Sequence, residues 1–343
     1  MLFRSNLKPV PDSRWHLRPE LRAIRRDARI RVCPYGAITA GESGAVLSDM
    51  ARLAPEVVGF SDDGKGVRSP ELMRAAMAEA KKLDRPIAAH CEDTSLLPDG
   101  GCVHAGHWAA EHGFPGIPSE SEWRMVERDI GLVRETGCRY HVCHVSSGES
   151  VELIRRAKAE GLPVTCETAP HYLLLCEDDL QDEGRFKMNP PVRAAADREA
   201  LLAGVLDGTV DCIATDHAPH AAAEKAGGLR GSAFGIVGLE TAFPLLYTQL
   251  VQTGLVPLPL LIDRMALRPR QIFRLPGGKI AEGEIADLTV LDTDRPHCID
   301  SRSFRSLGRA TPFDGWPVTA AVAMTICGGQ AVFGDLRREE TDD

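Results

Sequence analysis

The sequence predicts an α/β protein built on the parallel sheet of a (β/α)8 barrel, and two observations carry that prediction. Short apolar, β-branched runs bounded by turn residues alternate with amphipathic helical stretches, an alternation typical of parallel sheets. Side chains of metal-binding types follow nearly every run, as on the catalytic face of such a barrel. The runs are residues 30–38, 57–61, 86–90, 140–145, 163–168 and 210–215.

The barrel is preferred to an open doubly wound sheet, because that fold gathers its ligands at a single switch point. Helical stretches at residues 70–83, 120–135 and 149–160 repeat apolar residues three and four positions apart, which gives each one face for the sheet. Only six of the eight strands of a complete barrel are found. We therefore expect the first two βα units to be missing from this chain.

The pattern changes after an amphipathic helix at residues 258–273. Glycine-punctuated runs with period-two alternation, at residues 277–292 and 318–333, predict a small antiparallel β-element. These boundaries divide the chain into a truncated barrel domain at 1–275, a small β-domain at 276–335 and a flexible tail at 336–343.

Composition narrows the class of function. The net charge is −9 and the basic residues form no stripe, so we expect a small-molecule substrate and no nucleic acid. No run approaches the roughly 18 apolar residues of a membrane helix, and the start lacks the layout of a signal peptide, so we expect no membrane contact and a cytoplasmic location. The ten cysteines include no Cys-x-x-Cys pair and are interpreted as reduced thiols.

Carboxylates close the second and the last predicted strand. Asp62 and Asp63 end the first of these, and only one of them can face inward. A carboxylate there can bridge two cations, whereas the simpler interpretation is a turn aspartate before Gly64. Asp216 ends the last strand, where it could bind a metal and accept the proton of an attacking water.

Histidines follow the third and the fourth strands. His90 closes a strand, which by itself is equally typical of a hydrogen-bonded structural histidine. Strand alternation puts His141 and His144 on opposite faces, so we assign His144 to the interior and His141 to the outside or the strand base. His220 lies in the loop after Asp216.

Two further segments are candidates for substrate binding. The glycine-rich stretch 216–240 is too long for a plain βα connection, and loops on the catalytic face usually hold substrate. Asn189, in FKMNPPVR, offers a donor and an acceptor, although a turn-capping role is the simpler interpretation. The chain contains no P-loop, no Gly-x-Gly-x-x-Gly after a strand and no Gly-x-Ser-x-Gly, which argues against nucleotide binding and serine hydrolysis.

These motifs together resemble a known family. FSDDG, AHCED, YHVCHVS, FKMNPPVR, IATDHAPH and FGIVGLETAFPLLYT are similar, in order and separation, to the motifs of bacterial class I dihydroorotases in the amidohydrolase superfamily. The resemblance runs from Asn6 to about Gly334. It implies a (β/α)8 barrel of the amidohydrolase type with a small C-terminal β-element.

The resemblance also implies roles for individual residues. Asp63 would bridge two zinc ions, and His90 and His144 would bind one of them. Asp216 would bind the other zinc and act as general base. The substrate would be held by Asn6, Asn189, His220, Phe234 and Gly235.

One departure from the family concerns its His-x-His-Leu-Arg segment on the first strand, which supplies two zinc ligands and an arginine for the substrate carboxylate. No two of the eleven histidines here are spaced as His-x-His. His16, followed by Leu17 and Arg18, mimics the motif but lies where the family has a helix. We therefore expect an N-terminally truncated chain that has lost one or both zinc ions of the complete site, binds at most one weakly and has negligible activity alone.

The implied reaction is the reversible, zinc-dependent closure of N-carbamoyl-L-aspartate to L-dihydroorotate, a step of pyrimidine synthesis. A hydantoinase or allantoinase is one alternative, but those enzymes carry a carboxylated lysine where this chain has Asp63. A second alternative is a non-catalytic homologue that serves as a structural partner of aspartate carbamoyltransferase. A homodimer and that carbamoyltransferase are the protein partners that the resemblance implies.

Overall fold

A parallel sheet forms the centre of the molecule. The computed structural model describes residues 2–3 and 7–334, and within them the strands β3, β6, β7 and β8 pair in that order. Single parallel bridges, Gly36 to Phe60 and Phe60 to Ile87, connect β3 to β2, which in turn pairs with β1. The strands are β1 Leu2–Phe3, β2 Cys33–Pro34, β3 Ile87–Ala89, β6 Tyr140–Val142, β7 Val164–Thr168 and β8 Cys212–Ile213.

All six predicted strand positions therefore contribute to one parallel arrangement, which confirms the α/β prediction with a parallel sheet. The first strand of this arrangement, β1, was not predicted as a strand. Within residues 2–3 and 7–334 no hydrogen-bonded ladder joins β8 to β1.

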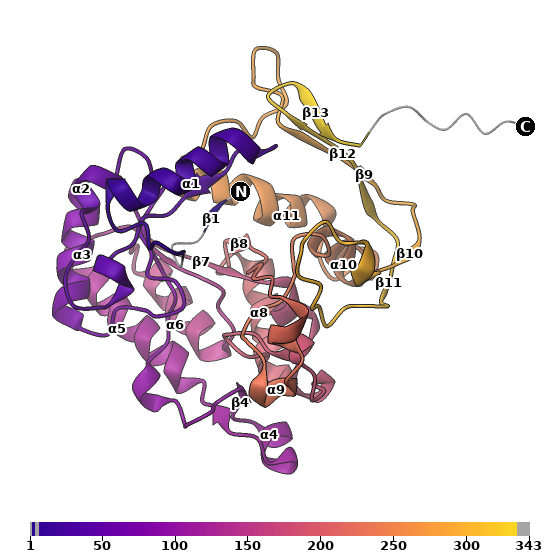
Figure 1. The fold of residues 1–343 in the computed structure, drawn as a ribbon, viewed down its shortest axis with the longest axis horizontal. Coiled ribbons are helices and arrows are strands. Elements are labelled where there is room, and N and C mark those ends of the chain that lie inside the picture. The colour runs from indigo at the N-terminus through magenta and orange to yellow at the C-terminus, as the bar shows by residue number, and fades with distance from the viewer. Residues whose placement is uncertain (1, 4–6, 335–343) are drawn as a thin grey trace, which may run out of the picture.

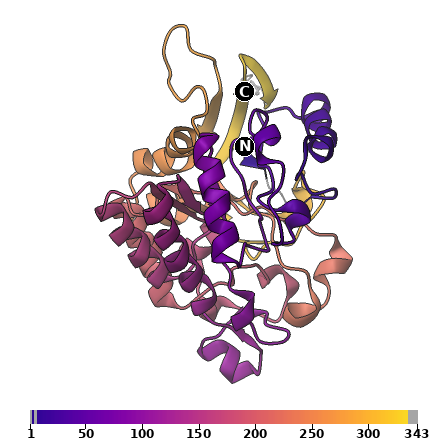
Figure 2. The ribbon, with the colours of Figure 1, turned by 90° about the vertical axis from the view of Figure 1, so that its left-hand side faces the viewer.

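Helices cover one face of the sheet, as Figures 1 and 2 show. The predicted helices form where the apolar periodicity places them, and side-chain oxygens cap several: Ser69 accepts from the amide of Leu72 at 3.2 Å at the start of α3. The long helices are α1 Arg14–Asp27, α3 Pro70–Lys82, α5 Glu120–Thr136, α6 Gly148–Ala159 and α8 Ala195–Asp207. The predicted helix at 258–273 is a continuous helical stretch made of α11 Leu258–Ile262, a π-helical turn at 263–267 and α12 Arg268–Ile272.

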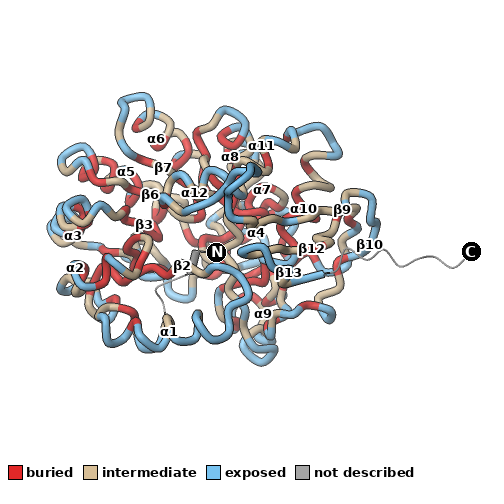
Figure 3. Tube along the Cα trace, turned by 90° about the horizontal axis from the view of Figure 1, so that it is seen from above, coloured by how far each residue is buried: buried red, intermediate tan, exposed pale blue. Residues whose placement is uncertain are grey.

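Shorter elements complete the connections. They are α2 Met50–Leu53, α4 His107–His112, α7 Pro170–Leu174, α9 Gly228–Gly231 and α10 Ala242–Leu246, together with the parallel pair β4 Val103–His104 and β5 Gly116–Ile117. Figure 3 shows that the buried residues concentrate around β3, β6 and β7 and on the inner sides of the surrounding helices.

The two faces of the sheet have different surroundings. Alternate residues such as Ile87 and Tyr140 pack in the main core with α3, α5 and α6. The alternate residues of each strand, such as Ala88 on β3, lie on the opposite face of the sheet, where Ala88 packs with Tyr35 and Phe273. Because parallel strands end at one edge, polar residues that follow the strands on this second face can converge.

The end of the chain forms the predicted antiparallel element. Figure 1 shows it beside α10 and α11, in yellow. Its main sheet has the order β13 Gln330–Phe333, β12 Ala321–Cys327 and β9 Leu288–Asp292, and β10 His297–Cys298 pairs with β11 Pro317–Val318. The domain boundaries at 275 and 335 stay predictions, and the tail 336–343 lies outside the described residues.

All ten cysteines are free in the structure, and their redox state stays a prediction. Among the described residues no helix is long and apolar enough to cross a membrane.

Candidate active site

Three side chains of metal-binding types meet at the edge where the strands end. One ligand atom from each of Asp63, His90 and His144 lies within 4.8 Å of the other two, and all three residues are buried. His90 Nδ1 is 3.1 Å from His144 Nε2, and His144 Nε2 is 3.7 Å from Asp63 Oδ1. We name these three residues the strand-end cluster. No second group of this kind is present in the part of the chain that the structure describes.

Adjacent aspartates at the end of the second predicted strand have different surroundings. Asp62 Oδ1 accepts hydrogen bonds from the amides of Ile38, at 2.7 Å, and Thr39, at 3.1 Å, and its Oδ2 accepts from the Thr39 hydroxyl. Burial raises the pKa of Asp62, although these donors oppose the rise. Asp62 therefore connects the end of the strand at residues 57–61 to the end of the strand at residues 30–38. Asp63 is the aspartate that lies near the histidines.

The backbone at His144 determines where its imidazole lies. His144 has a φ of 37°, in the left-handed region that residues with a side chain rarely adopt. This turn interrupts the alternation of the strand, so the imidazole reaches His90. Strained backbone of this kind persists only where the surroundings fix it, and it concentrates at functional sites.

The assignment of His141 and His144 to opposite faces is wrong for that reason. His141 is paired in register with Ala88, two residues before His90, so His141 and His90 share a face. His141 is nevertheless separate from the cluster: its Nδ1 lies 2.8 Å from Thr165 Oγ1 and its ring packs edge-on against Phe273.

Hydrogen-bonding side chains also connect His90 to Asn189 through Glu92. His90 Nε2 lies 3.6 Å from Glu92 Oε2, and Asn189 Nδ2 donates to Glu92 Oε1 at 3.0 Å. Burial alone would raise the pKa of Glu92, but the interactions with His90 and Asn189 outweigh it and keep that pKa below its usual range. Asn189 Oδ1 is buried without a hydrogen-bond partner, as expected of an acceptor that awaits a ligand.

Glu92 was quoted in the AHCED motif but received no role from the sequence. Its position two residues after His90 was the available signal, because residues two apart on an extended chain share a face.

The strand-end cluster fits a metal ion. Two nitrogens bound to one zinc at 2.0–2.1 Å in tetrahedral geometry lie about 3.3 Å apart, close to the 3.1 Å between His90 Nδ1 and His144 Nε2. Two imidazoles and a carboxylate form a donor set that suits zinc and related divalent ions.

Asp216 follows β8 and is not one of the side chains of the strand-end cluster. Its φ of 46° is also left-handed, as at His144. The two residues thus share an unusual backbone at the ends of parallel strands. Its roles as ligand and general base stay predictions.

Three of the predicted substrate residues meet in the glycine-rich loop, residues 216–240. His220 Nε2 lies 2.8 Å from the carbonyl oxygen of Phe234. Gly235 has a φ of 127°, and a Cβ there would lie 2.7 Å from the Ala218 carbonyl oxygen and 3.1 Å from His220 Nε2. Only glycine permits this close approach. The remaining substrate candidate, Asn6, lies outside the described residues.

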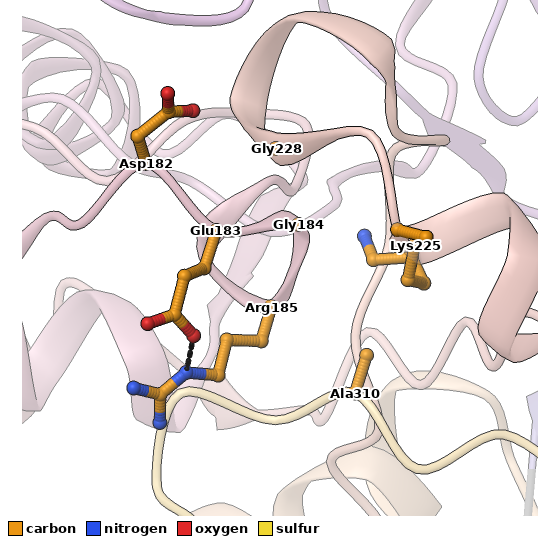
Figure 4. Close-up of a pocket in the computed structure, with 8 residues that line it drawn as sticks. Asp182, Glu183, Gly184, Arg185, Lys225, Gly228 and Ala310 are labelled. Atoms are coloured by element: carbon orange, nitrogen blue, oxygen red, sulfur yellow. Dashed lines mark hydrogen bonds and ion pairs between the residues drawn. The ribbon is translucent and has the colours of Figure 1, made fainter.

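Other features lie apart from this site. His16, on α1, pairs with Asp12 at 2.7 Å and is not in the strand-end cluster. A cavity of about 280 Å³, shown in Figure 4, is lined in part by Lys225, Ala226 and Gly228 of the glycine-rich loop, but by none of the individually predicted site residues. Its lining is Asp182, Glu183, Gly184, Arg185, Lys225, Ala226, Gly228 and Ala310.

Solved structures similar to this chain include hydantoinases and a dihydropyrimidinase. An L-hydantoinase from Arthrobacter aurescens superposes with a TM-score of 0.85 at 26% identity, covering 97% of this chain and 76% of the other. A dihydropyrimidinase from Brevibacillus agri gives a TM-score of 0.80 at 19% identity, with the same coverage, and shows a shared fold.

Sequence relatives share much higher identity. A Dihydro-orotase-like family model matches residues 4–150. A dihydroorotase from Geobacillus sp. (strain WCH70) and one from Bacillus caldolyticus are each 48% identical over 330 residues, which are 96% of this chain and 77% of the relative. A third, from Anoxybacillus flavithermus, is 46% identical over 97% of this chain and 78% of its own length. The chain therefore belongs to the dihydroorotase family of cyclic amide hydrolases.

Proposed function

We propose that the chain interconverts L-dihydroorotate and N-carbamoyl-L-aspartate at the strand-end cluster, with zinc held by Asp63, His90 and His144. The observation that carries this proposal is the buried cluster itself, whose spacing matches that of ligands around a single ion. Its three residues lie in the motifs that resemble the family.

The zinc would polarise the ring amide carbonyl and make a bound water acidic. Asp216 would accept a proton from the attacking water, whose oxygen forms a bond to the carbonyl carbon. As the carbon–nitrogen bond of the ring breaks, the same carboxyl group would return the proton to the leaving nitrogen. Ring closure uses these groups in the reverse order.

The chain's polar groups would orient the substrate. Asn189 Oδ1 is the buried acceptor that needs a donor, and a ring N–H provides one. Phe234 and Gly235, held by the bond from His220, would present backbone groups to the substrate. Asn6 completes the proposed set.

The proposal also includes a complete description of the fold and of the number of metal ions. The parallel strands, the helices on one face and the polar residues at the strand ends support a (β/α)8 barrel. Two zinc ions in a complete site, with Asp63 as the bridge, remain part of the proposal, as do a cytoplasmic location, a homodimer and a partnership with aspartate carbamoyltransferase.

The hydantoinase alternative rests on fold alone, because those structures share at most 26% identity with this chain whereas the dihydroorotases share 46–48%. For the non-catalytic alternative the structure supplies no favourable observation. The retention of three buried ligands argues for chemistry at this site.

The direct test measures both binding and turnover. The zinc-loaded chain is titrated with L-dihydroorotate by calorimetry, and interconversion with N-carbamoyl-L-aspartate is followed in both directions, with hydantoin as the comparison compound. We expect zinc-dependent binding of dihydroorotate and no binding of hydantoin. The absence of turnover in both directions would contradict the proposal and would agree with the expectation of negligible activity. A measurable zinc-dependent rate would overturn that expectation.

A further inference from the structure

Glu122 is a buried carboxylate that the proposed reaction does not use. It lies on α5, it is 3% exposed, and it is not in the strand-end cluster. A charge in such a place is costly unless donors surround it. Glu122 has them: its Oε1 accepts from the Ser147 amide at 3.0 Å and from the Ser150 hydroxyl at 2.7 Å, and both of its oxygens lie 3.2 Å from the Ser146 amide.

These donors belong to the segment that immediately follows His144. The left-handed backbone at His144 needs fixed neighbours to persist. On one side the Val145 amide donates to the Glu167 carbonyl at 2.7 Å. On the other side the amides of Ser146 and Ser147 donate to Glu122. The strained residue is therefore held by β7 and by α5 together.

Arg193 connects Glu122 and Ser146 to the segment that contains Asn189. Its guanidinium donates to the Ser146 hydroxyl and to the Ile117 carbonyl, each at 3.0 Å, and lies 3.9 Å from Glu122. Burial together with the charge of Arg193 lowers the pKa of the adjacent His104 to about 4, so this histidine adds no second positive charge. Arg193 lies four residues beyond Asn189, in FKMNPPVR.

We propose that Glu122 is a positioning residue for the active site. Its carboxylate holds His144 in the left-handed conformation that directs the imidazole toward His90, and through Arg193 it fixes the segment of Asn189 at the same place. This inference rests on the proposed function, because the ligand role of His144 is part of it. The simpler role for Glu122 is to anchor the start of α6, where Ser147 is the N-cap. That role affects stability alone.

The test uses Glu122→Asp. This variant keeps a negative charge beside Arg193, but it is shorter by one methylene and cannot reach all of the serine donors. Glu127→Asp, exposed on the same helix, is the matched control. The measurements are Co²⁺ affinity, the visible spectrum of the Co²⁺ complex and the φ of residue 144 in a crystal structure. For Glu122→Asp we expect affinity about tenfold weaker, an altered spectrum and loss of the left-handed conformation. The control stays native.

Native Co²⁺ affinity together with a retained positive φ at residue 144 in Glu122→Asp would overturn the proposal, even if the melting temperature fell. If that variant is insoluble, Ser146→Ala decides, because it removes the hydroxyl between Glu122 and Arg193 and leaves both charges in place. Its expected Co²⁺ affinity is about tenfold weaker, and native affinity would overturn the proposal. If the native chain binds no Co²⁺, the proposed function fails, and the φ of residue 144 alone decides the role of Glu122.

Discussion

The strand-end cluster and the glycine-rich loop supply different parts of one site by different physical means. The cluster residues Asp63, His90 and His144 are 7%, 3% and 4% exposed and follow strands that are buried on both faces. In the loop, Phe234 is 37% exposed, and backbone hydrogen bonds and a glycine set its shape. Groups that must bind a metal need fixed geometry, whereas groups that admit a substrate need access to solvent. Mutations in the two regions should therefore affect different measurements.

The largest effect is expected at Asp216, the first residue of the glycine-rich loop. Asp216→Asn removes the proposed proton acceptor and keeps the shape of the side chain. We expect kcat to fall about 10²–10⁴-fold while the melting temperature stays within a few degrees. Steady-state turnover of L-dihydroorotate measures this, and a rate near that of the native chain would show that another group accepts the proton.

The second-largest effect is expected at His144, which follows β6, and it is compared with the effect at His141 on β6. His144→Gln should weaken Zn²⁺ binding by at least about 100-fold, because it removes a direct ligand rather than an outer partner. His141→Gln is the matched control, since His141 is equally buried but bonds to Thr165 outside the cluster. Competition with a chromogenic chelator gives both affinities. Equal losses in the two variants would mean that the cluster does not bind the metal.

Adjacent aspartates provide a third contrast. Asp62→Asn should lower the free energy of unfolding by about 1–3 kcal/mol, because an amide cannot replace a carboxylate that accepts three hydrogen bonds. Its Zn²⁺ affinity should remain native. Asp63→Asn should do the opposite, with weaker Zn²⁺ binding and little loss of stability. Urea unfolding and metal titration of both variants make the comparison, and a reversed pattern would exchange their roles.

A change at Gly235 in the loop should affect substrate binding alone. Gly235→Ala places a Cβ against Ala218 and His220 at a φ that alanine rarely adopts, so we expect dihydroorotate affinity to weaken about tenfold with Zn²⁺ affinity unchanged. Gly231→Ala is the control, because its Cβ would meet no neighbouring atom within 4 Å. Calorimetry gives both affinities. Weakened zinc binding in Gly235→Ala would show that the loop and the cluster are not separate.

The smallest effect lies outside both regions, at Glu20 beside an apolar groove along α1. Burial raises the pKa of Glu20 to about 7 from a usual value near 4.5, so the folded state binds more protons between these values. Its contribution to stability is present below about pH 4.5 and is lost as the pH rises through 7. We expect Glu20→Gln to be about 1 kcal/mol more stable than the native chain at pH 8, a figure reduced for partial solvent exposure. Urea unfolding at pH 5 and pH 8 measures this, and a pH-independent difference would contradict it.

The sequence predicted the strands and helices well because buried parallel strands are continuous apolar runs and surface helices repeat at three and four residues. Asp63, His90 and His144, which were each predicted as metal ligands, are the three residues that the structure brings together. Strand alternation gave a wrong face for His141, because the alternation ends where the backbone at His144 becomes left-handed. No local sequence pattern predicted that left-handed conformation. Glu122 received no role because its partners, Ser146, Ser147 and Arg193, are distant in the chain. For Glu92, the distant partner is Asn189.

The measurement that tests the central claim most directly is anomalous X-ray diffraction at the zinc absorption edge, from crystals of the native chain grown with Zn²⁺. We predict one peak between Asp63, His90 and His144, at about 2.0–2.2 Å from a ligand atom of each. If there is no peak at that place and His90 and His144 instead remain hydrogen-bonded to each other, the strand-end cluster is not a metal centre.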